Sequence, residues 1–299
     1  MNKICKISII ITLLLSLYLS LTINKKYYNF ITESNSQMQK AVNECANENS
    51  DNELIDYCNE ILENSKYMVD FYSVLSSMVV FELKYLSPFS FLFLCIPTIS
   101  FILKYYKNTF FPNIIQGNNY FLYLKKIIKK SYNYIWLLPA TAIILFVPIL
   151  FYTTLDPSYA LNYGTSIWPN TIIETPSLFI IYYFLNIFLH AGVFINISMI
   201  SIRIKPKFFY SLIISILIYI LLEAFMEGFL GIFLCYKILK VNIADIFNIM
   251  SVYVFKTQNG VLASLGFILI LFLITLFIVY LLYKNQNEVE ASCRKCFIK

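Results

Sequence analysis

The chain has 299 residues, a mean hydropathy of +0.68 and a net charge of +6, and 13% of its residues are charged. Soluble domains carry about 25% charged residues, so this composition excludes an ordinary soluble globular protein. Several stretches of about 18 or more residues consist almost entirely of Ile, Leu, Phe, Val and Tyr. We therefore expect an integral membrane protein.

The apolar stretches predict helices, because backbone polar groups inside a bilayer must pair within the spanning element. Crossing about 30 Å of hydrocarbon takes about 20 helical residues. Spans are expected at residues 7–23, 86–103, 134–152, 178–201, 208–234 and 261–283. The expected fold class is an all-α integral membrane protein with six transmembrane helices.

The first apolar run, within residues 1–23, is predicted to be a transmembrane anchor. It follows Lys3 and Lys6, and a cleavable signal peptide also has a basic start and a short apolar core. The run ends in Thr-Ile-Asn-Lys at residues 22–25, which offers no small-x-small cleavage site. This favours a retained anchor.

The distribution of Lys and Arg predicts that the N and C termini are both cytoplasmic, because cytoplasmic loops retain positive charge. With both ends inside, the inner segments are residues 1–6, 104–131, 201–207 and the basic tail 284–299. These segments hold most of the 23 basic residues and only two acids. The net charge thus reflects topology, and we expect no nucleic-acid partner. The expected location is the cell membrane, as a multi-pass protein in the lipid bilayer.

Residues 24–85 are expected to form a polar helical segment outside the cytoplasm, before the five-helix bundle of residues 86–283. Apolar residues recur there near helical spacing, which indicates a small helical hairpin between the first and second spans. Cys45 and Cys58 fall in this segment. Outside the cytoplasm they could be joined in a disulfide that pins the hairpin, or both could be free.

Three polar residues interrupt the fourth expected span. They are Asn186, His190 and Asn196, and we expect them to make polar contacts between helices. His190 is the only histidine, so no second His is present to form a metal pair. We expect a hydrogen-bonded packing role for it.

Glu223 and Glu227 lie four residues apart, on one face of the fifth expected helix. A carboxylate in hydrocarbon is costly unless it is paired, solvated or protonated. One interpretation is a polar lining near the outer end of the span, or a pair with His190 or Lys237. The other, which we favour, is that the span ends near Leu222 and a re-entrant or interfacial helix follows it.

Catalytic motifs are missing from the sequence, which contains no G-x-S-x-G, H-E-x-x-H or G-x-x-x-x-G-K-[ST] pattern. A membrane-embedded enzyme would need Glu223, Glu227 and His190 to converge. We expect no enzymatic activity, no metal and no cofactor in this chain. If ATP is used, a partner subunit binds it.

Residues 118–131 predict an interfacial helix in the cytoplasmic segment before the third span. Its basic side carries Lys125, Lys126, Lys129 and Lys130. The side expected to face lipid carries Phe121, Leu124, Ile127 and Ile128. Anionic headgroups alone would account for such a helix. The alternative is a docking helix for a cytoplasmic partner.

This arrangement resembles the membrane subunits of type-2 ABC exporters, the ABC-2 permease family. The resemblance covers most of the chain: six spans, a polar outer segment after the first, a basic helix before the third and a broken hydrophobic hairpin after the fifth. In that family a coupling helix before the third span contacts the ATPase. The matching positions are Tyr120, Tyr123, Lys126 and Lys130, and Lys125 and Lys129 complete the expected ATPase-coupling set. Many members carry an acid and a Gly-Thr pair before this helix, where this chain has Lys107-Asn108-Thr109.

The resemblance implies a permease subunit of an ATP-driven exporter. Such a subunit forms a homo- or heterodimer with a second permease subunit, binds a separate ABC ATPase subunit through residues 118–131, and moves a hydrophobic or amphipathic substrate outward. The competing hypothesis is a stand-alone multi-pass immunity, sensor or binding protein, whose outer hairpin binds a partner and which has no ATPase. Both hypotheses predict the same topology.

Overall fold

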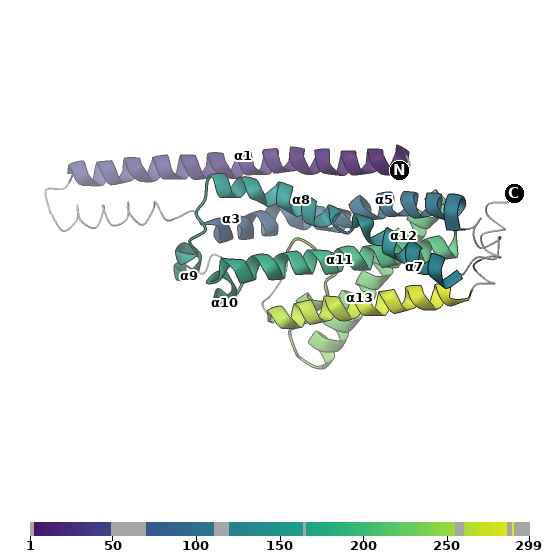
Figure 1. Ribbon diagram of the computed structural model, residues 1–299. Coiled ribbons are helices and arrows are strands. Elements are labelled where there is room, and N and C mark those ends of the chain that lie inside the picture. Colours follow the sequence, from purple (N-terminus) through teal and green to yellow (C-terminus); the bar gives the residue numbers. More distant parts are fainter. Residues whose placement is uncertain are drawn as a thin grey trace. The chain divides into compact units, whose positions relative to one another are not determined.

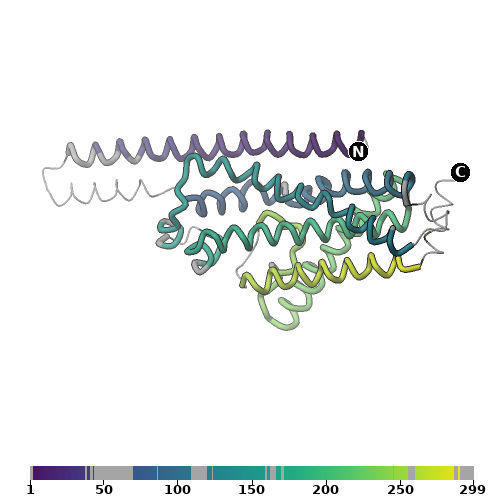
Figure 2. Tube along the Cα trace, in the orientation of Figure 1, coloured from purple at the N-terminus to yellow at the C-terminus, as the bar shows by residue number. Residues whose placement is uncertain are grey.

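The computed structural model describes residues 3–48, 70–110, 120–163, 166–254, 260–285 and 289. These residues are mostly helical and contain no β-strand (Figures 1 and 2). The chain divides into two compact units. Unit 1 comprises residues 1–14, 84–142 and 180–299, and unit 2 comprises residues 15–83 and 143–179.

Six helical runs in the described residues are long and apolar enough to cross a membrane, which confirms the predicted number. They are Lys3–Gln37, Ser87–Asn108, Tyr120–Phe151, Pro176–Ile204, Phe208–Ile238 and Val261–Lys284. Large apolar side chains are exposed along them, and Phe209 and Leu262 each expose 76% of their surface. Exposed apolar surface of this extent, on helices of this length, is typical of a multi-pass membrane protein.

Helix α1 (Lys3–Glu48) continues for 46 residues without a break, whereas the first span was expected to end at residue 23. Residues 24–48 contain neither Gly nor Pro, and their Ala, Glu, Gln and Lys residues favour helix. At 1.5 Å per residue α1 is about 69 Å long, more than twice the bilayer core. The first arm of the expected hairpin is therefore a direct extension of the first span. The rest of the hairpin, residues 49–69, lies outside the described residues.

The buried face of α1 is polar. Thr12, Ser16, Ser20 and Asn24 follow one another at four-residue intervals and are all buried. In unit 2, Ser20 Oγ donates to the carbonyl oxygen of Ile144 at 2.6 Å, and Asn24 Nδ2 donates to that of Leu145 at 3.2 Å. Both carbonyls belong to α8 (Leu137–Phe146). Small polar residues let transmembrane helices approach closely and bond across the contact, so α1 packs through its Ser and Thr face and exposes its Ile and Leu face.

The remainder of unit 2 surrounds a short apolar helix. This short helix is α3 (Phe71–Met78). The other elements of this part of unit 2 are the π-helical turn η1 (Val79–Leu83), η5 (Val147–Phe151), α9 (Ser158–Tyr163) and α10 (Asn170–Ile173). The N–H of Phe71 donates to the Thr154 carbonyl at 2.8 Å, and the Tyr72 ring meets Phe179 edge-on at 5.2 Å. Residues 71–83 thus form an apolar, mostly buried helix within the segment that was expected to be polar.

Asp70 caps the start of α3 and is completely buried. Its Oδ1 accepts from the Ser73 N–H at 2.8 Å, and its Oδ2 accepts from the Ser73 hydroxyl at 2.7 Å. Burial and the Asp70 charge raise the pKa of the neighbouring Tyr72 to about 12.

Replacing Asp70 by Ala is expected to lower the stability of the protein by about 0.5–2 kcal/mol, the usual cost of removing a helix N-cap. The Asp70→Asn variant keeps an oxygen for the Ser73 N–H and should lose less. Thermal unfolding of the purified protein in mild detergent measures both. Equal losses in the two variants would contradict a capping role.

Unit 1 contains most of the long helices. Its elements are α4 (Lys84–Leu86), η2 (Ser87–Phe89), α5 (Ser90–Tyr105), η3 (Tyr106–Phe110), α7 (Tyr120–Ser131), η4 (Tyr132–Tyr134), the first part of α8, α11 (Pro176–Ile204) from Ile180 on, α12 (Phe208–Glu223), η6 (Ala224–Ile238), η7 (Ala244–Phe247) and α13 (Val261–Lys284). Helices α5, α11 and α12 meet in an aromatic cluster. Phe91 stacks on Tyr219 at 4.5 Å, and Phe194 meets both rings edge-on.

Helices α11 and α13 run parallel, side by side (Figure 1). Asn196 bonds to Thr275, and farther along both helices the Tyr283 hydroxyl donates to the Met199 carbonyl at 3.0 Å. Residue numbers rise together along the contact, which fixes the parallel direction.

Candidate functional site

Helix α7 carries the residues expected to couple to an ATPase, and one of its faces is packed against unit 1. The packed residues are Tyr120, Leu124, Ile127 and Ser131, all buried. Their spacing of four, three and four residues is that of one helix face. Leu124 and Ile127 were expected to face lipid, and that expectation is wrong because both side chains are covered by protein.

The opposite surface of α7 is exposed and combines basic and apolar side chains. It contains Phe121, Leu122, Lys125, Lys126, Lys129 and Lys130. Phe121 exposes 61% of its surface and Leu122 exposes 51%. The Lys130 ammonium lies 4.7 Å from the centre of the Tyr105 ring, a cation–π contact that ties one edge of this surface to α5. Tyr123 lies in α7, and its side chain is outside the described part of the structure. We call the exposed set the α7 surface.

The start of α7 is bonded to the end of α13. Tyr120 is buried, and its hydroxyl donates to the Tyr283 carbonyl at 2.5 Å. The Tyr283 hydroxyl in turn donates to the Met199 carbonyl of α11, and Arg203 Nε donates to the Leu282 carbonyl at 3.0 Å. Tyr120 therefore attaches α7 to α13, and Tyr283 and Arg203 attach this end of α13 to α11.

Helix α7 is followed closely by the third span. The helical run extends from Tyr120 to Phe151, 32 residues, and η4 forms its 3₁₀ turn. The sequence predicted a separate interfacial helix followed by a span from residue 134. In the structure α7 ends at Ser131, and η4 and a turn at residues 135–136 separate it from α8, although all of them belong to one helical run.

A second polar site surrounds residues 248–254, which we call the inserted segment. They follow η7 and form no long helix, yet Ile249, Val252 and Tyr253 are at most 1% exposed. Non-helical backbone among membrane-spanning helices is tolerated only where protein or water satisfies its polar groups. The partners of this segment are therefore central to its stability.

Side chains from several elements bond to the backbone of the inserted segment. Asn186 Nδ2 donates to the Val252 carbonyl at 3.2 Å, and the Tyr183 hydroxyl donates to the Tyr253 carbonyl at 2.5 Å. The Tyr253 N–H donates to Ser87 Oγ at 3.4 Å. The Tyr253 hydroxyl pairs with Thr141 Oγ1 at 2.8 Å. Helices α8 and α11 and the turn η2 thus hold one non-helical stretch of chain.

Glu223 and Glu227 hold the other end of the inserted segment. Glu223 Oε2 accepts from the Ile249 N–H at 2.9 Å, and Glu227 Oε2 accepts from Asn248 Nδ2 at 2.8 Å. Within the described residues no hydrogen bond or ion pair joins either acid to His190 or Lys237, the partners considered from sequence. The two carboxyls therefore fasten a loop.

The helix that carries the two acids does not end at Leu222. The run Phe208–Ile238 is continuous over 31 residues, but its hydrogen bonding changes from α to π after Glu223, where η6 begins. Gly231 lies where η6 meets η7, and a Cβ there would come 3.1 Å from the Cα of Ala244. The favoured expectation, a span that ends near Leu222 and is followed by a re-entrant or interfacial helix, stays a prediction, and a change in helix type occurs at that point.

One oxygen of Glu223 has no partner among the described residues. Glu223 Oε1 and the Tyr219 hydroxyl, one helical turn earlier, are both buried, and neither forms a hydrogen bond within that part of the chain. Buried polar atoms of this kind are usually satisfied by water. A water molecule or a polar group entering beside α12 would find two partners here.

Asn196 belongs to a separate cluster. It accepts a short hydrogen bond from the Tyr132 hydroxyl and donates to Thr275 Oγ1 at 3.0 Å, so it links η4, α11 and α13. His190 Nδ1 lies 2.9 Å from the Asn186 carbonyl oxygen one turn earlier in the same helix. Of the three polar residues expected in the fourth span, Asn186 and Asn196 contact other elements, and His190 bonds within its own helix.

The expected disulfide stays a prediction, because Cys58 and the side chain of Cys45 lie outside the described part of the structure. Cys5, Cys95 and Cys235 are free and buried. Within the described ranges no group of three or more His, Cys, Asp or Glu side chains is placed to hold a metal ion.

The sequence analysis missed Ser87, Thr141, Tyr183 and Tyr253. Each stands in a largely apolar stretch and has no charge, so hydropathy gave no reason to single it out. Residues 239–254 were the available signal. They are too short and too polar to form a span of their own, and they lie between the fifth and sixth spans.

Comparison of the chain with protein-family models, with curated proteins and with solved structures found no match.

Proposed function

We propose that this chain is the membrane subunit of an ATP-driven exporter of the ABC-2 type, in which ATP is bound and hydrolysed by a separate ATPase subunit. The chain itself has no enzymatic role and needs no cofactor in this proposal. It pairs with a second permease subunit in the cell membrane, with both termini in the cytoplasm.

The observation that carries the proposal is the α7 surface. Three lysines, Lys125, Lys126 and Lys129, are exposed beside Phe121 and Leu122, while the opposite face of α7 is packed against unit 1. Mixed apolar and basic surfaces suit the docking of an acidic partner. A helix that only rested on lipid would not need its other face buried in protein.

The attachment of α7 supports coupling as well as docking. A force on α7 would reach α13 through the Tyr120–Tyr283 hydrogen bond and α11 through the Tyr283–Met199 bond. Contiguous hydrogen bonds between rigid helices are a physical route for such coupling. In the proposal, ATP-driven movement of the partner reorients these helices and moves substrate outward.

The test is to purify the tagged full chain from its native membrane in mild detergent and identify co-purifying proteins by mass spectrometry. We expect an ATPase subunit in stoichiometric amount. The Lys125→Glu, Lys129→Glu variant should reduce its recovery at least about tenfold, because like charges across an interface cost several kcal/mol. The Lys125→Arg, Lys129→Arg variant keeps the charge and serves as the control. Membrane yield of each variant checks insertion.

The alternative is a stand-alone immunity, sensor or binding protein. The long exposed extension of α1 favours it, since Phe30 exposes 68% of its surface. In that case the purification recovers a partner that is lost in a Phe30→Ser variant and retained in the α7 variant. If no ATPase co-purifies with the folded protein, the exporter proposal is wrong and this alternative takes its place.

A further inference from the structure

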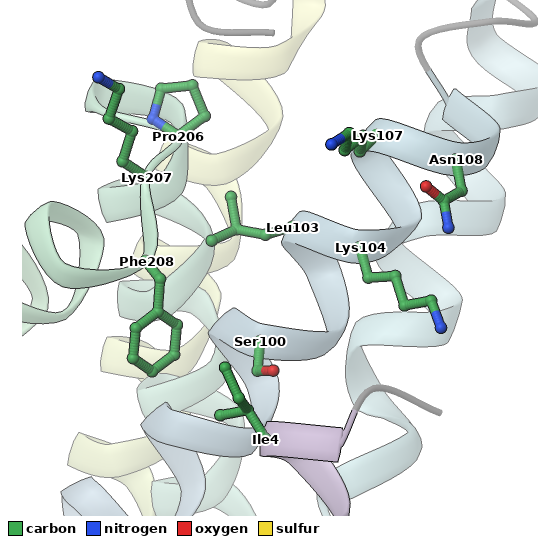
Figure 3. Close-up of a pocket in the computed structure, with 9 residues that line it drawn as sticks. All are labelled: Ile4, Ser100, Leu103, Lys104, Lys107, Asn108, Pro206, Lys207 and Phe208. Atoms are coloured by element: carbon green, nitrogen blue, oxygen red, sulfur yellow. The ribbon is translucent and has the colours of Figure 1, made fainter.

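A basic cavity of about 530 Å³ opens at one end of unit 1. It lies between the last turns of α5, the turn that joins α11 to α12, and the start of α1 (Figure 3). Its lining residues are Ile4, Ser100, Leu103, Lys104, Lys107, Asn108, Pro206, Lys207 and Phe208. None of the residues of the α7 surface or the inserted segment belongs to it.

The lining has two chemically distinct parts. Lys104, Lys107 and Lys207 are exposed, and none of them forms an ion pair within the described part of the chain. Ile4, Leu103 and Phe208 supply an apolar wall, and none of the described residues that line the cavity is acidic. Figure 3 shows Leu103 pointing from α5 toward the turn that carries Pro206 and Lys207. Lys107 and Lys207 lie on opposite sides of the opening.

The position along α5 follows from sequence spacing. Leu103, Lys104 and Lys107 follow Ser100 by three, four and seven residues, the spacing of one helix side. Ser100, Leu103 and Lys104 lie in α5, and Lys107 lies in η3. Pro206 and Lys207 form the short turn between α11 and α12. The second wall is therefore the connection between two spans.

The cavity lies where spans end. The second span ends at Asn108, the fourth at Ile204, and the fifth begins at Phe208. Side chains at this level border the bilayer core on one side and the headgroups on the other, and the long stems of lysines reach the headgroup layer. An occupant must therefore be apolar at one end and anionic at the other.

We propose that this cavity binds an anionic phospholipid, with its phosphate between Lys107 and Lys207 and the first part of an acyl chain against Leu103, Phe208 and Ile4. Basic pockets between transmembrane helices bind anionic headgroups in this manner. The lining residues lie outside the α7 surface, so the site is independent of the proposed function.

The test uses the full chain in mild detergent after delipidation, with phosphatidylglycerol as the probe and native mass spectrometry to count bound lipid. We expect one phosphatidylglycerol to bind in preference to phosphatidylcholine. The Lys107→Ala, Lys207→Ala variant should weaken binding about 25-fold, at about fivefold per lysine. The Lys125→Ala, Lys129→Ala variant removes equal charge from the α7 surface and should bind normally.

Three results would overturn the proposal: equal binding of phosphatidylcholine, equal loss in the α7 control, or displacement of the lipid by soluble glycerol phosphate, which would assign the cavity to a free phosphate compound. Thermal unfolding in phosphatidylcholine checks that the variants are folded. The Phe208→Ser variant tests the apolar wall separately. It should weaken long-chain phosphatidylglycerol more than the short-chain form, and an equal effect on both would contradict an acyl-chain contact.

Discussion

Replacing Glu223 by Leu is expected to release the inserted segment from the helix that carries Glu223. The Ile249 N–H donates to Glu223 Oε2 at 2.9 Å, and Ile249 is fully buried. Without this acceptor the N–H is left unsatisfied, and a buried unsatisfied donor costs about 1–3 kcal/mol.

The measurement is the reaction rate of a thiol placed in the inserted segment. Val252 is fully buried, so the Val252→Cys variant, made after the native cysteines are replaced, should react slowly with maleimide. Adding Glu223→Leu should speed the reaction about 5–150-fold, the factor that corresponds to 1–3 kcal/mol. Glu223→Gln keeps an acceptor oxygen and is the matched control. An unchanged rate with Leu, or an equal increase with Gln, would contradict the assigned role.

Replacing Gly192 by Leu is expected to destabilise the protein by about 1–3 kcal/mol through overpacking. A Cβ at Gly192 would come 2.6 Å from Cε2 and 2.7 Å from Cδ2 of Phe272, so α11 and α13 approach each other across this glycine. The Phe272 ring also meets Tyr132 edge-on at 6.3 Å. Moving the ring away from Gly192 therefore disturbs a second contact.

A double-mutant cycle tests this contact. Phe272→Ala alone is expected to lower the stability of the protein. Combining it with Gly192→Leu should cost less than the sum of the two single losses, because the introduced leucine can occupy the space that the Phe272 ring vacates. Unfolding free energies in detergent measure the four proteins. Gly266→Leu in α13 is the control, since a Cβ there has no atom within 4 Å. If both glycine variants behaved alike, the close approach at Gly192 would be wrong.

The spans were predictable because the requirement for them is local. A helix that crosses hydrocarbon needs a long apolar stretch, so hydropathy located all six, and the observed starts of the fifth and sixth, Phe208 and Val261, are the predicted ones. The end of α1 was not predictable in the same way. Hydropathy falls at residue 24, but helix formation does not depend on hydropathy, and no Gly or Pro stops the helix there.

Helix α7 shows how far periodicity reaches. The spacing of its lysines placed them on one side, and they are exposed in the structure. The same spacing placed Leu124 and Ile127 on an apolar face, yet it contained no information about what covers that face. Lipid and a neighbouring helix are both apolar, so only the packing of unit 1 distinguished them.

By itself the sequence determined that this is a helical chain with six apolar helices long enough to cross a membrane, and it located the polar residues among them. Only the tertiary structure decided how those residues pair. Glu223 meets Ile249, Asn186 meets Val252, and Tyr120 meets Tyr283, across separations of 26, 66 and 163 residues. Such partners are set by how helices pack and where a loop returns between them, and helix packing in an apolar solvent depends on the fit of whole surfaces.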